Sequence, residues 1–343
     1  MSEKYLISQE IGSFRKPTYL SSVFHKIQGT EEFNVLAGRA TIETIDLFKK
    51  AGLDNIGVGG EMFRWEMYEH QANRINGITF YGPVRSFDNR YYKKGSITDR
   101  IERKEPYHLD ELEFLLENNI SNIKIPVTGP YTMMDWSFNE HYRDRYETAM
   151  EFAKLLNEDM RELKREWDRK YSGKKLEIQI DEPATTTHPD EMNIVVDSIN
   201  KSVEGIDNVE FSMHVCYSID YRLLYDVMDD IKIDGFNLEF ANRDTLERGT
   251  DDSSRPGYTD LKYFNEHNDK KKFMGLGVTD VHIDYIEPVE LIKDRINYAL
   301  KILPPELIRL NPDCGLRTRT REIGYEKLKN MDIARQEILK EIR

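Results

Sequence analysis

Cysteine is nearly absent from this chain, which has two among its 343 residues. Two cysteines cannot build the disulfide framework of a small secreted protein, so we expect a reducing, cytoplasmic environment. Long apolar runs are missing as well: none follows Met1, and no stretch of 18 apolar residues occurs anywhere. The sequence therefore predicts neither a signal peptide nor a membrane-spanning helix, and no membrane partner.

Basic residues are in the minority. The 62 acidic side chains outnumber the 49 of Lys and Arg, which gives a formal net charge of −13. Binding to a phosphate backbone calls for a basic surface, so we expect no nucleic-acid partner. With 39% hydrophobic and 32% charged residues, the composition is that of a soluble globular protein with a substantial core.

Short apolar segments alternate with segments of helical periodicity along the chain. The candidate strands lie at 5–13, 53–61, 120–130, 176–183, 209–218, 235–242, 272–282 and 307–315. The helical segments lie at 31–51, 109–118, 140–171, 189–205, 219–231, 258–268, 287–303 and 321–342. A doubly wound sheet would share this alternation, but neither G-x-G-x-x-G nor a P-loop follows any strand. We therefore predict an α/β protein, a (β/α)8 TIM barrel that forms a single domain over 1–343, with residues 62–108 as an excursion over the barrel mouth.

Ionisable residues stand at the C-terminal ends of the predicted strands, which meet on the face of a barrel where active sites lie. His214 and Cys216 are two residues apart on one strand, so their side chains share a face. Glu239 ends the next strand and Cys314 the last one. Two thiolates, an imidazole and a carboxylate suit a tetrahedral zinc ion. Because the spacing is not that of a zinc finger, two unrelated buried cysteines are the alternative explanation.

Eight motifs, in order along nearly the whole chain, carry a family resemblance. They are EIGSFRKP (10–17), GGEMFRWEMYEH (59–70), GPYTMMDWSF (129–138), IQIDEPA (178–184), MHVCYS (213–218), EFANRD (239–244), VTDVH (278–282) and LNPDCGLRTR (310–319). The IDEPA and NPDCGL motifs are the most specific. On these residues the chain resembles the C-terminal catalytic domain of cobalamin-independent methionine synthase, in the stand-alone form of the archaeal core enzymes.

The resemblance implies a TIM barrel and a role for each site residue. The ligands of one zinc ion would be His214, Cys216, Glu239 and Cys314. The positions that match those holding L-homocysteine are Ile11, Ser13, Glu61 and Asp181. Zinc coordination deprotonates a thiol, whose pKa is otherwise about 8.5, so the substrate sulfur would become a nucleophilic thiolate.

The resemblance also places a methyl donor and a proton donor. Trp136 matches a position that stacks on the pterin of methyltetrahydrofolate, and Arg90 and Tyr91 lie where other members contact the folate. His282 matches the proton donor, with Asp280 as its partner.

Two features depart from the family pattern, both on the donor side. The two-domain enzyme has an N-terminal half of similar barrel form, for which 343 residues leave no room. Thr187 stands where the family has a glutamate that contacts the folate. We therefore expect the donor to be methylcobalamin, a methylated corrinoid protein or a non-classical methyl-pterin, with a separate partner subunit as a further option.

The predicted function is zinc-dependent methyl transfer to L-homocysteine, giving methionine. The alternatives are another zinc-dependent thiol alkyltransferase of the coenzyme M type, a methyltetrahydrofolate-dependent methionine synthase, and a catalytically silent subunit. The acidic Glu61 and Asp181 favour an amino acid over a sulfonate, because they can hold its ammonium group. Arg317 and Arg319 are either a solvated pair or an anion-binding pair.

Overall fold

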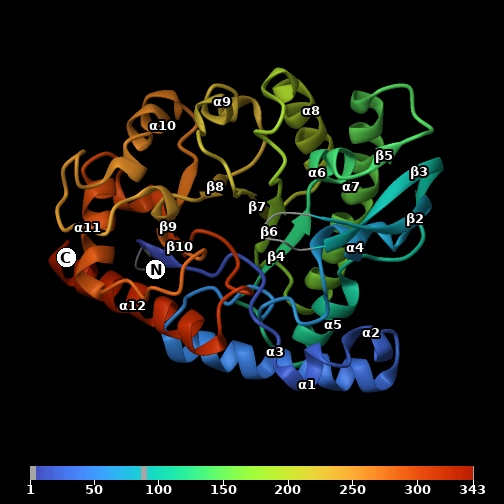
Figure 1. Ribbon diagram of the computed structural model, residues 1–343, viewed down its shortest axis with the longest axis horizontal. Coiled ribbons are helices and arrows are strands. Elements are labelled where there is room, and N and C mark those ends of the chain that lie inside the picture. Colours follow the sequence, from blue (N-terminus) through green and yellow to red (C-terminus); the bar gives the residue numbers. More distant parts are fainter. Residues whose placement is uncertain (1–4, 86–90, 343) are drawn as a thin grey trace.

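Seven parallel strands form one curved sheet at the centre of the protein (Figure 1). The computed structural model describes residues 5–85 and 91–342. The strands follow one another in the order β1-β10-β9-β8-β7-β6-β4. Their bounds are β1 Ile7–Ser8, β4 Lys124–Thr128, β6 Leu176–Asp181, β7 Val209–Val215, β8 Gly235–Leu238, β9 Phe273–Thr279 and β10 Ile308–Pro312. Most of their residues are buried, as is usual for parallel strands covered on both faces.

The first and last strands of the chain pair with each other, and a short segment closes the remaining gap in the barrel. β1 pairs with β10 on one side. On its other side the N–H groups of Asp54 and Asn55 both donate to the Ser8 carbonyl, at 3.1 and 3.0 Å. Ile56 N–H donates at 3.2 Å to the carbonyl of Asn122, just before β4. Segment 54–56 therefore bridges the gap between β1 and β4.

The predicted strand at 53–61 is wrong beyond this bridge. Gly57, Gly59 and Gly60 have φ angles of +53°, +74° and +83°, and Glu61 has φ of +58°. Left-handed backbone does not continue a strand, so the chain turns at these glycines. The other seven predicted strands are present, each shorter than predicted.

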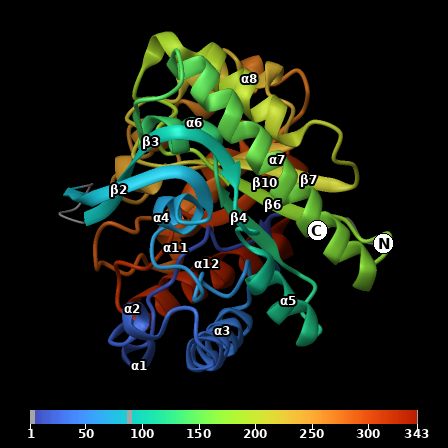
Figure 2. The same cartoon turned by 90° about the vertical axis from the view of Figure 1, so that its right-hand side faces the viewer.

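Helices cover the outside of the sheet (Figures 1 and 2). The longer ones are α3 Glu31–Ala51, α5 Leu109–Glu117, α7 Arg145–Lys170, α8 Met192–Val203, α10 Leu261–His267, α11 Val289–Leu300 and α12 Arg321–Glu341. The short helices are α1 Thr18–Ser21, α2 Phe24–Ile27, α4 Met67–Ala72, α6 Pro130–Asp135 and α9 Arg222–Tyr225. The 3-10 turns are η2 Pro189–Glu191, η3 Met228–Asp230, η4 Ala241–Arg243, η5 Pro256–Tyr258 and η6 Pro305–Leu307.

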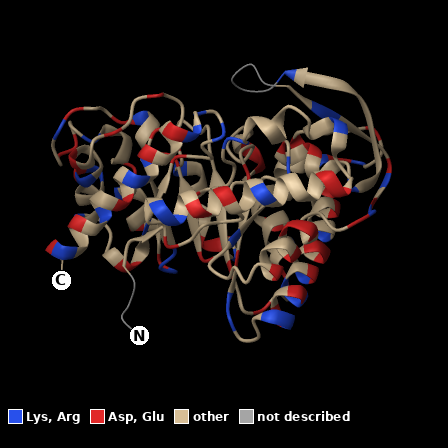
Figure 3. Ribbon diagram, turned by 90° about the horizontal axis from the view of Figure 1, so that it is seen from below, with Lys and Arg blue, Asp and Glu red and all other residues tan. Residues whose placement is uncertain are grey.

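Local sequence explains where the long helices begin. Asp144 starts α7 by accepting the N–H of Glu147 at 2.8 Å, and an apolar face of the helix then packs on the core. The predicted helix at 219–231 is wrong as a single element, because it is divided into α9 and η3. Figure 3 shows acidic and basic residues side by side on the outer helices.

A second, small sheet stands at one edge of the barrel (Figures 1 and 2). It is a hairpin of β2 (Ile75–Arg85) and β3 (Tyr91–Arg103), with β5 (Phe138–Asn139) parallel to β3. Alternate residues of β2 are covered and exposed, so one face of the hairpin packs on the protein. The predicted excursion at 62–108 thus contains α4 and this hairpin.

Candidate active site

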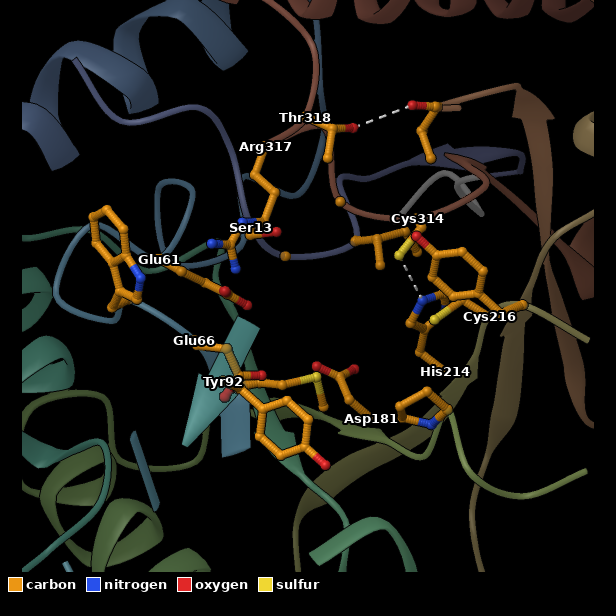
Figure 4. A pocket seen from close by; sticks show the side chains of 18 of the residues that line it. Ser13, Glu61, Glu66, Tyr92, Asp181, His214, Cys216, Cys314, Arg317 and Thr318 are labelled. Atoms are coloured by element: carbon orange, nitrogen blue, oxygen red, sulfur yellow. Dashed lines mark hydrogen bonds between the residues drawn. The ribbon is translucent and has the colours of Figure 1, made fainter. Parts of the chain in front are cut away.

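A cavity of about 440 Å³ opens at the C-terminal ends of the strands (Figure 4). Its walls come from the loops after β1, β6, β7, β9 and β10, from the segment before α4 and from the hairpin. Most of the predicted site residues line it, namely Ile11, Ser13, Glu61, Tyr91, Trp136, Asp181, His214, Cys216, His282 and Cys314. Arg90 lies outside the described residues. The barrel therefore brings both ends of the chain and its middle to one cavity.

His214, Cys216 and Cys314 come together on one wall of this cavity. One ligand atom from each of the three lies within 4.8 Å of the other two. His214 Nε2 is 3.4 Å from the Cys314 sulfur, while Nδ1 is 2.8 Å from the carbonyl of Asn237. That carbonyl can only accept, so it fixes the ring with Nε2 directed at the thiols. Two soft sulfur donors and an imidazole nitrogen suit zinc.

Two protons of this cluster, on His214 and Cys216, lie beside the Cys314 sulfur, where a cation could replace them. A hydrogen bond from Cys216 lowers the pKa of Cys314 well below its ordinary value, and the same bond raises the pKa of Cys216. Burial lowers the pKa of His214, but the hydrogen bond and charge of Cys314 raise it to about 9. Cys314 is thus a thiolate that two neighbouring donors stabilise. Exchange of those two protons for one divalent cation keeps the charges balanced.

Glu239, the fourth predicted ligand, is not among the described residues whose ligand atoms all lie within 4.8 Å of one another. It is fully buried, and its Oε2 accepts the N–H of Tyr217 at 2.6 Å and the amide of Asn242 at 3.1 Å. Its Oε1 is 3.1 Å from His282 Nε2. Three partners therefore fix the carboxylate beside the cluster.

The imidazole of His282 faces Glu239 and not Asp280, the partner that the sequence predicts. Asp280 instead accepts the backbone N–H of His282 at 2.7 Å, which fixes the loop after β9. The hydrogen bond to Glu239 raises the pKa of His282 to about 9, against an opposing effect of burial. His282 is therefore protonated at neutral pH, and its side chain lines the cavity.

Glu61 and Asp181 place two carboxylates on the walls of the cavity. A Cβ at Gly12 would lie 2.7 Å from Glu61 Oε1, so the carboxylate packs directly on the backbone after β1. Asp181 Oδ1 accepts the Gln179 amide at 2.7 Å. Burial, with the nearby charge of Glu61, raises the pKa of Asp181 to about 7, although His214 opposes this.

Barrel arginines do not neutralise these two carboxylates. Within residues 5–85 and 91–342, neither has a Lys or Arg nitrogen within 4.0 Å, and the neighbouring Arg64 pairs with Glu111 instead. Lys16 donates to the Glu61 carbonyl at 2.8 Å, not to its carboxylate. The cavity therefore offers carboxylate oxygens to a cation that enters from outside.

Aromatic residues form the opposite side of the cavity. Trp136 follows α6 directly, and its ring centroid is 5.5 Å from that of Tyr92 on the hairpin. Tyr91 and Trp65 also line the cavity. Thr187, where the resemblance to the family predicts a glutamate, is exposed and is not among the lining residues that the structure describes.

Sequence reasoning missed several residues of the cavity, including Trp65, Glu66, Tyr92 and Tyr217. Trp65 and Glu66 lie inside the motif GGEMFRWEMYEH, directly before its last residues begin α4. Tyr217 has φ of +57°, a backbone conformation that no sequence pattern predicts here. The motif content was therefore a usable signal for two of them, whereas the backbone turn at Tyr217 was not.

Comparison with known proteins identifies the family. A family model described as the catalytic domain of cobalamin-independent synthase matches residues 6–337. A protein named methionine synthase from Thermoplasma volcanium is 64% identical over 341 residues, covering 98% of this chain and 99% of that protein. The protein of the same name from Thermoplasma acidophilum is 65% identical with the same coverage. The chain belongs to the cobalamin-independent methionine synthase family. As a member, it is an enzyme of the homocysteine methyltransferase class.

A solved structure of this family confirms the fold. The B12-independent methionine synthase from Shewanella sp. W3-18-1, in complex with selenomethionine, matches with a TM-score of 0.81. It is 23% identical and covers 99% of each chain. The α/β barrel predicted from the sequence is therefore correct. No helix in the described ranges is long and apolar enough to cross a membrane.

Proposed function

We propose that this methionine synthase family member moves a methyl group to L-homocysteine with the help of one zinc ion. The observation that carries the proposal is the convergence of His214, Cys216 and Cys314 within 4.8 Å, in a cavity that also holds two carboxylates with no Lys or Arg partner among the described residues. Zinc bound there would supply a Lewis acid that keeps the substrate sulfur as a thiolate.

Glu239 would complete the ligand set. Its carboxylate adjoins the cluster through Tyr217, the residue after Cys216, whose N–H it accepts. A carboxylate that already has three partners binds a metal weakly, so the incoming sulfur could displace it without leaving a buried charge unpaired.

The amino-acid part of the substrate would lie against Glu61 and Asp181. Both are acceptors, and an α-ammonium group is the cation they would meet in an amino-acid thiol. Ile11 and Ser13 would form the wall at the same end of the cavity, since both line it directly after β1. A sulfonate thiol such as coenzyme M has no ammonium group and would leave the two carboxylates unpaired.

His282 would hold the proton that the leaving group takes. Its imidazole lines the cavity, and Glu239 supports the protonated form. A pterin N5 needs such a proton when the methyl group leaves, whereas a corrinoid does not. Asp280 would act as a positioning residue through the His282 backbone.

The methyl donor would stack on the aromatic wall that Trp136 and Tyr92 form, with Tyr91 and Arg90 as its further contacts. An aromatic wall accepts any flat ring system. The exposed Thr187 removes one carboxylate that a classical folate would use. We therefore propose a methylcorrinoid or a non-classical methyl-pterin as the donor, which a separate partner subunit could carry.

The test offers the purified protein each acceptor with each donor and measures the methylated product. We expect methionine from L-homocysteine with methylcobalamin, faster than with methyltetrahydrofolate triglutamate, and little product from coenzyme M. A preference for the folate would contradict the donor, and a preference for coenzyme M the acceptor. Metal analysis of the same sample should find about one zinc per chain.

A further inference from the structure

Among the Asp, Glu, Lys and Arg side chains on the cavity walls, the acidic ones are in the majority. Glu61, Glu66 and Asp181 line it, and Arg317 is the one Lys or Arg among the lining residues that the structure describes. An amino acid is a zwitterion, and a wall that attracts its ammonium group repels its carboxylate at short range. The two lining imidazoles face other groups, His214 the Cys314 sulfur and His282 the Glu239 carboxylate, so Arg317 is the lining cation on the side of Ser13.

Arg317 is carried by the loop after β10, which packs tightly against the loop after β1. A Cβ at Gly315 would lie 2.4 Å from the Ser13 hydroxyl and 3.0 Å from the Ser13 nitrogen, so the two backbones touch. The hydroxyl of Thr318 is 3.4 Å from the carbonyl of Val281, which ties the same loop to the end of β9. The base of Arg317 is thus fixed on both sides.

The direction of the side chain suits a substrate carboxylate. Figure 4 shows Arg317 reaching from its loop into the cavity, on the side of Ser13 and Glu61. Cys314 lies three residues before Arg317 on the same loop, so one loop carries both a sulfur of the metal cluster and this guanidinium. The hairpin tyrosines and Trp136 belong to other elements.

We propose that Arg317 determines the specificity for an α-amino acid by pairing with the substrate α-carboxylate, with Ser13 as the neutral donor beside it. This inference rests on the proposed function. A guanidinium binds a carboxylate through two parallel N–H donors, which a lysine cannot reproduce. The walls of the cavity would then divide the zwitterion: Glu61 and Asp181 take the ammonium group, and Arg317 takes the carboxylate.

The test measures equilibrium binding of L-methionine, which has no thiol and needs no turnover. Its matched analogue is 3-(methylthio)propylamine, which lacks only the carboxylate. We expect Arg317→Gln to weaken L-methionine binding about 10- to 100-fold in calorimetry and to leave the analogue within about twofold. Arg317→Lys should recover part of the loss, and it also serves if the glutamine variant is unstable.

Arg319→Gln is the matched control. Arg319 lies two residues further along the same loop, but it pairs with Asp284 at 2.5 Å and does not line the cavity. We expect this variant to bind both ligands as the wild type does. Unchanged L-methionine binding in Arg317→Gln, equal losses for both ligands, or a change confined to the KM of the methyl donor would each overturn the inference alone. A wild type that neither binds L-methionine nor methylates L-homocysteine would instead overturn the proposed function.

Discussion

Replacement of Asp181 by asparagine tests the proposed ammonium site most sharply, because the structure fixes how the new amide must turn. Asp181 Oδ1 accepts the Gln179 amide N–H at 2.7 Å. Gln179 cannot reverse, since its Oε1 accepts from Asn237 at 2.9 Å and its nitrogen also donates to the Ile11 carbonyl at 2.7 Å. An asparagine at position 181 would therefore direct its oxygen to Gln179 and its NH2 group into the cavity.

The substrate ammonium group would then lose a charged acceptor and meet a donor. Loss of a hydrogen bond to a charged group costs about 1.5–3 kcal/mol, and the facing donor puts the expected value in the upper part of that range. A loss of about 2–3 kcal/mol corresponds to about 30- to 150-fold weaker binding of L-homocysteine. The thiol 4-mercaptobutanoate lacks the ammonium group, so its affinity should not fall.

Calorimetric titration with both thiols, at equal zinc content, measures the difference. Zinc content has to be matched because Asp181 lies opposite His214 in the pairing of β6 with β7. Equal weakening of both thiols would refute the reasoning, since it would mean that Asp181 acts through the metal cluster and not through the ammonium group.

Two further predictions concern the metal and the pH dependence of stability. Cys314→Ser should lower the zinc content by mass spectrometry and abolish turnover while the barrel stays folded by circular dichroism; full metal content would contradict the ligand role. Burial raises the pKa of Glu10 to about 8 from 4.5, and its Oε1 has no hydrogen-bond partner among the described residues. The folded state therefore binds this proton more tightly than the unfolded state, and it loses stability as the pH rises from about 4.5 to about 8. Glu10→Gln should flatten the fall in the unfolding midpoint between about pH 5 and pH 9, and identical slopes would speak against this.

The sequence predicts the elements well where one periodicity dominates. The helical segment at 31–51 has the bounds of α3, because Thr30 caps its start and Gly52, at φ of +97°, ends it. The polar strand ends are also readable, since a run of apolar residues that stops at an ionisable one is a local signal. His214, Cys216 and Cys314 could therefore be grouped before their distances were known.

Other features depend on contacts that are distant in sequence. The turn at 57–61 follows from glycines with left-handed backbone, but the apolar residues around them are equally typical of a strand. The partner of His282 is Glu239, 43 residues away, whereas the resemblance to the family pointed to Asp280. The strands of the hairpin carry polar residues on their exposed face, so the sequence predicts only an excursion there and not two strands.

The two halves of the cavity arise from different parts of the chain, and this bears on the methyl donor. The pairing of β1 with β10 brings the loop with Ile11 and Ser13 against the loop with Cys314, Gly315 and Arg317. This seam helps to close the barrel, so an insertion in either loop would disturb the fold itself, whereas single side chains that face the cavity can be replaced. The wall that we propose for the methyl donor consists of Trp136 and a hairpin that is not part of the barrel sheet, so substitutions on the exposed face of the hairpin leave the barrel intact. On this proposal, a change of methyl donor requires changes in the hairpin and not in the seam that holds the amino-acid acceptor.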